Sequence, residues 1–156
     1  MTSVSEHAQC DPDTASNKAT CRLASRPGPE VFDAYDSFIR SVPFLNSRQA
    51  SALIVSGDEI LDNLLTHGEI GQRGVVVLVR KRHSTLTLGF FVESHREFTE
   101  FVSCLERSLH YEPRFDAVSG RWRGLGLSMC RNIASSIYYR PGRQVDRVLL
   151  TFEPDA

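Results

Sequence analysis

Residues 56–68 read Ser-Gly-Asp-Glu-Ile-Leu-Asp-Asn-Leu-Leu-Thr-His-Gly, and this stretch decides the predicted fold. In a helix with about 100° of rotation per residue, several of its polar residues fall within one band about 80° wide. The band holds Ser56, Glu59, Asn63 and His67, and the adjoining apolar face holds Leu53, Gly57, Ile60, Leu61 and Leu64. The stretch therefore predicts a half-buried helix on which a carboxylate and an amide face the same region.

The spacing of Glu59 and Asn63 is the best indication of chemistry in the chain. A carboxylate can polarise an attacking hydroxyl group or water, and an amide oxygen one turn away can be a ligand for Mg²⁺. A site for nucleotide phosphates needs both groups. Two alternatives stay open. Glu59 and Asn63 can be solvated residues of a polar face, and His67 can cap a carbonyl group at the end of the helix.

A second candidate is Gly124-Leu125-Gly126, a Gly-x-Gly turn at the point where a loop is predicted to become a helix. The backbone amides of such a turn can face an anion, and a helix N-terminus favours negative charge. A phosphate cradle and a purely structural turn both explain this motif.

Glu93 and His95 follow a predicted strand and can be read as an acid/base pair. No serine or cysteine lies in a nucleophile elbow, and one sequence with five histidines does not select the partners of a triad. We therefore assign no hydrolase role to this pair.

The composition is that of one soluble domain. The chain has 156 residues, of which 41% are hydrophobic, so it can bury a proper core. The formal net charge is −1, and the basic residues are scattered along the sequence apart from Arg80-Lys81-Arg82. This distribution predicts neither a nucleic-acid partner nor a membrane surface as partner.

The cysteines indicate a reducing compartment. Cys10, Cys21, Cys104 and Cys130 stand far apart, without a Cys-x-x-Cys pair or clustered histidines. This spacing argues against a zinc site and against a disulfide framework. Because the apolar stretches are strand-sized and no secretory signal is present, the expected location is the cytoplasm.

The pattern along the chain predicts a flexible N-terminal tail, residues 1–18, and a single domain, residues 19–156. Helical spacing predicts one helix from Val31 to just before Pro43, and a second helix that Asn46 and Gln49 cap. The other predicted elements are an edge strand at 20–24, a hairpin at 74–80 and 85–92, a helix at 98–109, an irregular loop at 111–122, a helix with apolar positions from 127 to 137, and a closing hairpin at 138–152.

Helices that alternate with antiparallel hairpins predict an α/β (α+β) two-layer sandwich. The expected sheet is mixed and mainly antiparallel, and helices cover one of its faces.

Together these features resemble the histidine-kinase-like ATPase superfamily, and in particular its stand-alone bacterial anti-sigma-factor serine kinases. The resemblance covers about residues 20–153. It rests on Glu59, Asn63 and His67-Gly68, which match the family's motif of Glu, then Asn, then His-Gly at successive steps of four residues. It rests also on Gly124-Leu125-Gly126, which looks like the family's glycine-rich motif before the last long helix.

The resemblance implies a Bergerat-like ATP-binding fold with ATP and Mg²⁺ as cofactors. It implies that Glu59 is the general base, that Asn63 is the Mg²⁺ ligand, and that the nucleotide is contacted by His67, Glu93, Gly124, Leu125 and Gly126. The family's adenine motif is Asp-x-Gly-x-Gly-Phe, and this chain has Glu93-Ser94-His95-Arg96-Glu97-Phe98 in its place. Glu93 stands for the adenine-binding aspartate, and His95 and Glu97 replace both glycines.

The function that the resemblance implies is regulation through a protein partner, either a sigma factor or an anti-anti-sigma-like antagonist. The γ-phosphate of ATP would pass to a serine of the antagonist. The altered adenine motif keeps a second interpretation open, a pseudo-kinase that acts as a protein-interaction switch without nucleotide.

A third interpretation is the catalytic domain of a two-component histidine kinase. We expect this least, because no helical segment with a phospho-acceptor histidine precedes the domain. A homodimer stays open, and no direct nucleic-acid or membrane partner is expected.

Overall fold

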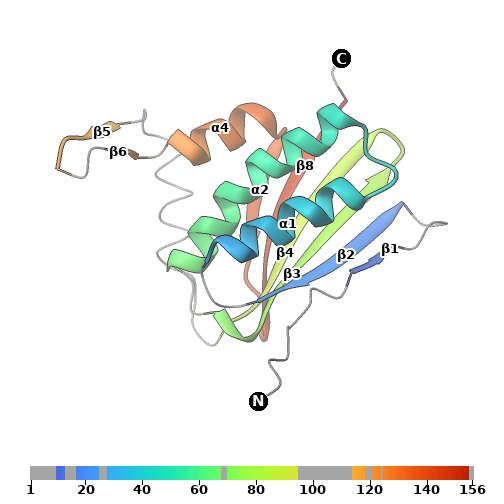
Figure 1. Cartoon of the computed structure of the whole chain (residues 1–156), viewed down its shortest axis with the longest axis horizontal. Coiled ribbons are helices and arrows are strands. Elements are labelled where there is room, and N and C mark those ends of the chain that lie inside the picture. Colours follow the sequence, from blue (N-terminus) through green and yellow to red (C-terminus); the bar gives the residue numbers. More distant parts are fainter. Residues whose placement is uncertain are drawn as a thin grey trace.

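The computed structural model describes residues 10–12, 17–24, 28–67, 70–94, 114–118, 121–123 and 125–154. Within these ranges the chain forms an α+β fold of two layers, an antiparallel sheet and the helices that cover one of its faces (Figure 1). The prediction of a two-layer sandwich is confirmed at this level. Every described strand pair is antiparallel, so the expected mixed sheet is corrected to an antiparallel one.

The large sheet has six strands. In chain order they are β1 (Cys10–Pro12), β2 (Lys18–Leu23), β3 (Ile70–Arg82), β4 (Thr85–Ser94), β7 (Ser136–Arg140) and β8 (Val145–Phe152). Their order across the sheet is β1-β2-β3-β4-β8-β7. The described helices are α1 (Pro29–Ser41), α2 (Ser47–His67) and α4 (Leu125–Ile133). A separate hairpin is formed by β5 (Arg114–Asp116) and β6 (Arg121–Arg123).

The hydrophobic core lies between the two layers. Every second residue of the central strands faces the helices and is buried, for instance Val77 on β3, Phe90 on β4 and Leu150 on β8. The residues between them face the opposite side of the sheet, and most of them are half-buried or exposed. No helix in the described part of the chain is long and apolar enough to cross a membrane.

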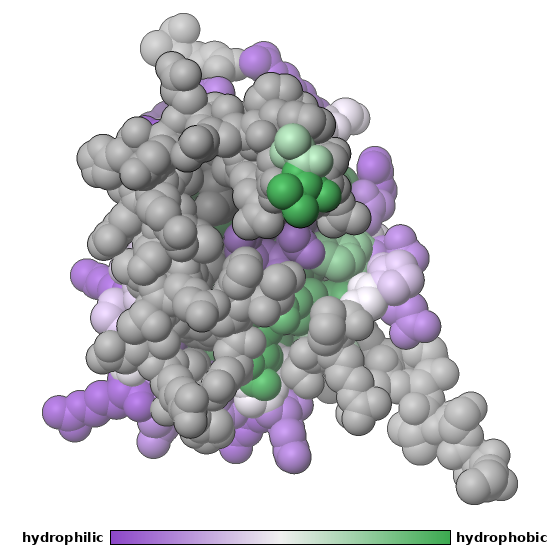
Figure 2. All heavy atoms as spheres, turned by 90° about the vertical axis from the view of Figure 1, so that its left-hand side faces the viewer, coloured by the Kyte–Doolittle hydropathy of each residue, from purple (hydrophilic) through white to green (hydrophobic). Residues whose placement is uncertain are grey.

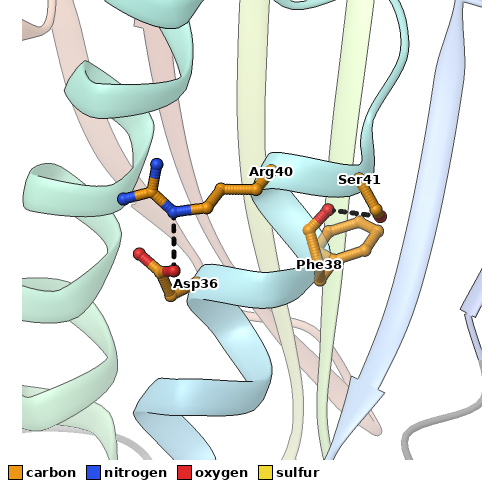
Figure 3. A network of polar contacts seen from close by, with 4 residues as sticks. All are labelled: Asp36, Phe38, Arg40 and Ser41. Atoms are coloured by element: carbon orange, nitrogen blue, oxygen red, sulfur yellow. Dashed lines mark hydrogen bonds and ion pairs between the residues drawn. The ribbon is translucent and has the colours of Figure 1, made fainter.

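Helix α1 follows its predicted amphipathic pattern. Its core residues are Val31, Tyr35, Phe38 and Ile39. On the outer side Asp36 and Arg40, one turn apart, form an ion pair of 2.7 Å (Figure 3). In the last turn the Ser41 hydroxyl group donates a hydrogen bond to the Phe38 carbonyl oxygen at 2.7 Å (Figure 3). The helix ends there, before Pro43, as predicted.

Helix α2 begins with the predicted capping box. The Asn46 Oδ1 atom accepts a hydrogen bond from the Gln49 amide at 2.8 Å, and the Gln49 Oε1 atom accepts one from the Asn46 amide at 3.1 Å. The predicted apolar face is confirmed, because Leu53, Ile60, Leu61 and Leu64 are completely buried.

Gly57 fixes how α2 lies against α1. The Tyr35 side chain is completely buried, and its hydroxyl group donates a hydrogen bond to the Leu53 carbonyl oxygen. A Cβ atom at residue 57 would lie 1.8 Å from the Tyr35 hydroxyl oxygen. Only glycine leaves room for the tyrosine here, so the rotation of α2 about its axis is constrained by this contact.

The central hairpin is longer than its predicted strands. Gly74 was expected to begin the first strand, but β3 already begins at Ile70. Gly74 adopts a positive φ of 69°, and the pairing register shifts between Ile70 and Val75. This β-bulge allows β3 to continue through Gly74, whose positive φ is rare for residues other than glycine.

Strand β1 lies within residues 1–18, the segment predicted to be a flexible tail. Its backbone pairs with β2, with Cys10 opposite Cys21, so backbone pairing orders a segment whose side chains predict no structure. Strand β2, predicted as an edge strand, therefore has a neighbour on both sides.

Helix α4 is shorter than its predicted pattern. It ends at Ile133, and Ile137 belongs to β7. The Ser135 amide donates a hydrogen bond to the Thr151 carbonyl oxygen at 2.7 Å, which directs the chain into the sheet. The β5–β6 hairpin lies in the segment predicted as an irregular loop, and the predicted helix at 98–109 lies outside the described residues.

Candidate functional site

The predicted polar stripe of α2 lies where this helix packs against α4. Ser56 is completely buried, and Glu59 and Asn63 are half-buried. The Cys130 thiol of α4 donates a hydrogen bond to the Ser56 carbonyl oxygen at 3.4 Å. Ser56 and Glu59 therefore lie near α4, and Asn63 is half-buried one turn further along α2.

Asn63 and Glu59 are in direct contact. The Nδ2 group of Asn63 donates a hydrogen bond of 2.7 Å to the backbone carbonyl oxygen of Glu59. This bond spans four residues and holds the amide side chain along the helix. The bond joins the Asn63 side chain to the backbone of Glu59 and does not involve the Glu59 carboxylate.

Glu59 has a raised pKa. Burial is the main cause, because it disfavours the charged carboxylate, and the nearby Asp62 carboxylate adds to the effect. A carboxylate whose pKa is shifted towards neutrality is a better general base than an exposed one.

Asp58, which the sequence pattern did not single out, has a stronger shift. Burial, then the Asp36 carboxylate of α1, then Glu59 raise its pKa from 3.8 to about 6. Its Oδ1 atom is buried and has no hydrogen-bond partner within the described residues. The sequence feature that could have indicated Asp58 is its position between Glu59 and Gly57, the glycine at which α2 contacts α1.

Cys130 is the second residue that sequence reasoning missed as part of this region. Burial, and then the Glu59 carboxylate, raise its pKa to about 12. A thiol with so high a pKa stays protonated near neutral pH, so Cys130 is a packing residue and not a nucleophile.

Glu93 is not brought together with Glu59 and Asn63. Along β4 the buried residues Leu88, Phe90 and Val92 face the helices, so Glu93 lies on the opposite face of the sheet. There its carboxylate forms an ion pair of 3.5 Å with Arg73. The sheet separates this carboxylate from the stripe on α2.

The other predicted site residues are placed only in part. His67 is the last residue of α2, as expected, and α4 begins at Leu125, with Gly126 in its first turn. Gly124 lies outside the described residues. The helix start that an anion-binding turn requires is therefore present at the predicted position.

Figure 2 faces the side of the molecule on which α4 begins, and the coloured atoms that are visible there belong to hydrophobic as well as hydrophilic residues. A separate cleft of about 640 Å³ lies near the beginning of α2, lined among others by Gln49, Leu86 and Ile133. None of the predicted site residues that the structure describes lines that cleft.

Within the described ranges, no three side chains of His, Cys, Asp or Glu gather in a way that could hold a metal ion by themselves. Comparison with models of protein families and with curated proteins gives no match.

Proposed function

We propose that this protein is a regulatory protein of the anti-sigma-factor type with a histidine-kinase-like, Bergerat-like ATPase domain. The part of the nucleotide site that holds Mg²⁺ and the phosphates would lie at Glu59 and Asn63. The observation that carries the proposal is the contact of these two half-buried residues on a helix that packs against α4. The order of elements supports it, since α1 and α2 precede the long β3–β4 hairpin, and α4 and the closing β7–β8 hairpin come later, after the β5–β6 hairpin.

The donor set of the stripe fits Mg²⁺. Mg²⁺ typically binds one or two oxygen atoms of the protein and completes its coordination shell with phosphate oxygens and waters. Asn63 uses its Nδ2 group for the Glu59 carbonyl, which leaves its Oδ1 atom as the metal ligand. When bound, ATP with Mg²⁺ would supply the phosphoryl group to be transferred.

Glu59 would orient a serine hydroxyl group and accept its proton. Its half-buried position and raised pKa support this role, because a general base works best when its pKa approaches the working pH. The Glu59 carbonyl group holds the Asn63 side chain, so the same residue positions the metal ligand.

The adenine part of the site does not include Glu93. Its carboxylate lies on the sheet face away from the helices and is paired with Arg73. The proposal therefore assigns to this chain a phosphate and metal site, and leaves adenine recognition to residues other than Glu93.

The experiment is a calorimetric titration of the full chain with ATP, with and without Mg²⁺. We expect micromolar binding with Mg²⁺, and a loss of at least about tenfold, equal to about 1.4 kcal/mol, when Mg²⁺ is omitted or in the variant Asn63→Ala. The control Asn132→Ala removes an exposed amide of α4 and should bind like the wild type. Unchanged affinity in Asn63→Ala would refute the role of Asn63.

A second function is a pseudo-kinase, a protein-interaction switch of the same fold without nucleotide. The observation that favours it is the pairing of Glu93 with Arg73 away from the stripe. It predicts that the same titration gives no heat of binding in the wild type, even at millimolar ATP with Mg²⁺.

A further inference from the structure

The sheet face away from the helices gathers cations that are scattered in the sequence. They are Lys18, Arg22, Arg80, Arg140 and Arg147, and all five are exposed. Alternation along the strands puts them on one face, and the strand register places them in two rows across the sheet, Lys18 with Arg80, and Arg22 with Arg147 and Arg140. The row of Leu78, Gly89 and Leu149 lies between these two rows. None of them forms an ion pair with a carboxylate within the described residues.

Two pairs of these cations stand directly opposite each other. Lys18 is opposite Arg80 across β2 and β3, and Arg147 is opposite Arg140 across β8 and β7. Like charges in directly opposed positions destabilise a sheet. The two like-charged pairs therefore lower the stability of the sheet. This cost indicates that the cations serve binding and not folding.

The centre of this face is apolar. Val76, Leu78, Phe91 and Leu149 are partly exposed on β3, β4 and β8, and Gly89 lies between them. A Cβ atom at Gly89 would lie 3.0 Å from side-chain atoms of both Leu149 and Phe91, so these two side chains lean over the glycine. We call the five cations and these five central residues the outer face. An exposed apolar patch with a charged border is typical of an interaction site.

We propose that the outer face binds an acidic amphipathic helix of a partner protein. From β3 to β8 the sheet spans two strand spacings, about 10 Å, which matches the diameter of a helix with its side chains. A helix that runs along the strands would place its apolar stripe on the centre. Acidic residues on its two flanks would then reach the cations of β2 and β3 on one side and those of β7 and β8 on the other.

Other occupants fit the outer face less well. A second copy of this chain would oppose five cations to five cations. A single-stranded nucleic acid needs exposed aromatic rings on which its bases stack. Among the described residues this side of the sheet has two aromatic rings: Phe91, which already has the Arg147 guanidinium group 6.0 Å from its centroid, and Tyr138, which is exposed on the edge strand β7 opposite Leu149. One exposed ring at the edge offers little stacking surface, so we expect a nucleic acid to bind less tightly than the acidic helix. The proposal does not depend on nucleotide binding, because the sheet separates the outer face from the stripe on α2.

The test uses the full chain and a labelled synthetic helix of about 14 residues, about 21 Å long, with leucines on one stripe and glutamates on both flanks. Fluorescence anisotropy would measure its affinity beside three other probes: a scrambled peptide of the same composition, the same helix with lysines for glutamates, and a labelled oligothymidylate. We expect the acidic helix to bind most tightly and its affinity to fall as salt rises. Thermal unfolding by circular dichroism would check that each variant is folded.

The variants Arg80→Glu and Arg147→Glu should each weaken binding of the acidic helix by about tenfold or more, equal to about 1.4 kcal/mol. The control Arg48→Glu makes the same charge change at the beginning of α2, on the other layer, where a carboxylate is tolerated by the helix dipole. This control should bind like the wild type.

Any one of the following results would overturn the proposal. One is an acidic helix that binds no better than its scrambled version, or that loses as much affinity in Arg48→Glu as in Arg80→Glu. Another is an oligothymidylate that binds more tightly than the acidic helix. A third is a dimer in sedimentation velocity that dissociates in Arg147→Glu, since the outer face would then be occupied by a second copy.

Discussion

Tyr35 of α1 packs directly on Gly57 of α2, so closely that a Cβ atom at residue 57 would lie 1.8 Å from the tyrosine hydroxyl oxygen. The same hydroxyl group donates a hydrogen bond to the Leu53 carbonyl oxygen one turn earlier. The contact fixes the rotation of α2 and thereby the direction in which Glu59 and Asn63 face.

Gly57→Ala should destabilise the protein, although alanine is the better helix former. Alanine in a helix gains about 0.5–1 kcal/mol over glycine. Overpacking of a core costs about 1–3 kcal/mol, and a 1.8 Å approach to a buried hydroxyl group is at the severe end of that range. We expect a net loss of about 2–2.5 kcal/mol in the free energy of unfolding by urea.

Two companion variants separate packing from helix propensity. Tyr35→Leu combined with Gly57→Ala should recover part of the loss, because the hydroxyl group is gone. Ser51→Ala, at an exposed position of the same helix, should be neutral or slightly stabilising. A Gly57→Ala protein as stable as the wild type would contradict the close contact.

Asp58 should make stability depend on pH. Its pKa rises from 3.8 to about 6 on folding, so the folded state binds the proton more tightly than the unfolded state. The contribution of Asp58 to the free energy of unfolding is therefore most favourable below pH 3.8 and falls as the pH rises to about 6. Above that pH the Asp58 carboxylate is charged in the folded protein as well. Asp58→Asn should be more stable than the wild type at pH 8 and should lose this part of the pH dependence.

The measurement is the urea midpoint of both proteins at pH 5 and pH 8. Asp33→Asn, which changes an exposed carboxylate of α1, serves as the control and should keep the wild-type pH dependence. A midpoint difference between wild type and Asp58→Asn that is the same at both pH values would contradict the raised pKa.

Cys130 should be almost inert towards alkylation in the folded protein. With a pKa of about 12, about one thiol in 10,000 is ionised at pH 8, and the side chain is completely buried. Iodoacetamide labelling followed by peptide mass spectrometry should find the Cys130 peptide unmodified in buffer and modified in denaturing urea. Rapid labelling in buffer would show that the Cys130 thiol is accessible to solvent in the folded protein.

Arg140→Thr should stabilise the fold, because it removes one of two cations that stand opposite each other on β7 and β8. We expect a gain of about 0.2–1 kcal/mol, or about 1–3 °C in Tm, and a smaller gain at high salt. The control Arg143→Thr changes an exposed arginine in the turn between these strands and should leave Tm unchanged. A lower Tm in Arg140→Thr would mean that Arg140 contributes to folding.

Local pattern predicted α1, α2 and the central hairpin because each depends on contacts within a few residues. The capping box of Asn46 and Gln49 and the buried face of α2 are examples. Strand β1 and the end of α4 were missed because they depend on backbone pairing with distant segments, such as the bond from Ser135 to Thr151. The β-strand propensity of a segment does not indicate with which distant segment its backbone pairs.

The candidate site was predictable where it lies on one element. Glu59 and Asn63 are four residues apart on α2, and the helix period alone puts them together. The position of Glu93 follows from strand alternation, since the buried series Leu88, Phe90 and Val92 leaves Glu93 on the other side. The outer face, by contrast, was hidden by the low net charge, because its cations come from four strands and meet only through the sheet register.

The most direct test of the nucleotide site is paramagnetic broadening by Mn²⁺, a substitute for Mg²⁺, in NMR spectra of the full chain with ATP. We predict that the side-chain amide signal of Asn63 and the backbone amide signals around it broaden first, and that signals of the sheet face around Glu93 and Arg73 do not. Broadening confined to the Glu93 side, or none at Asn63 at saturating Mn²⁺ and ATP, would contradict the assignment of the metal and phosphate site to α2.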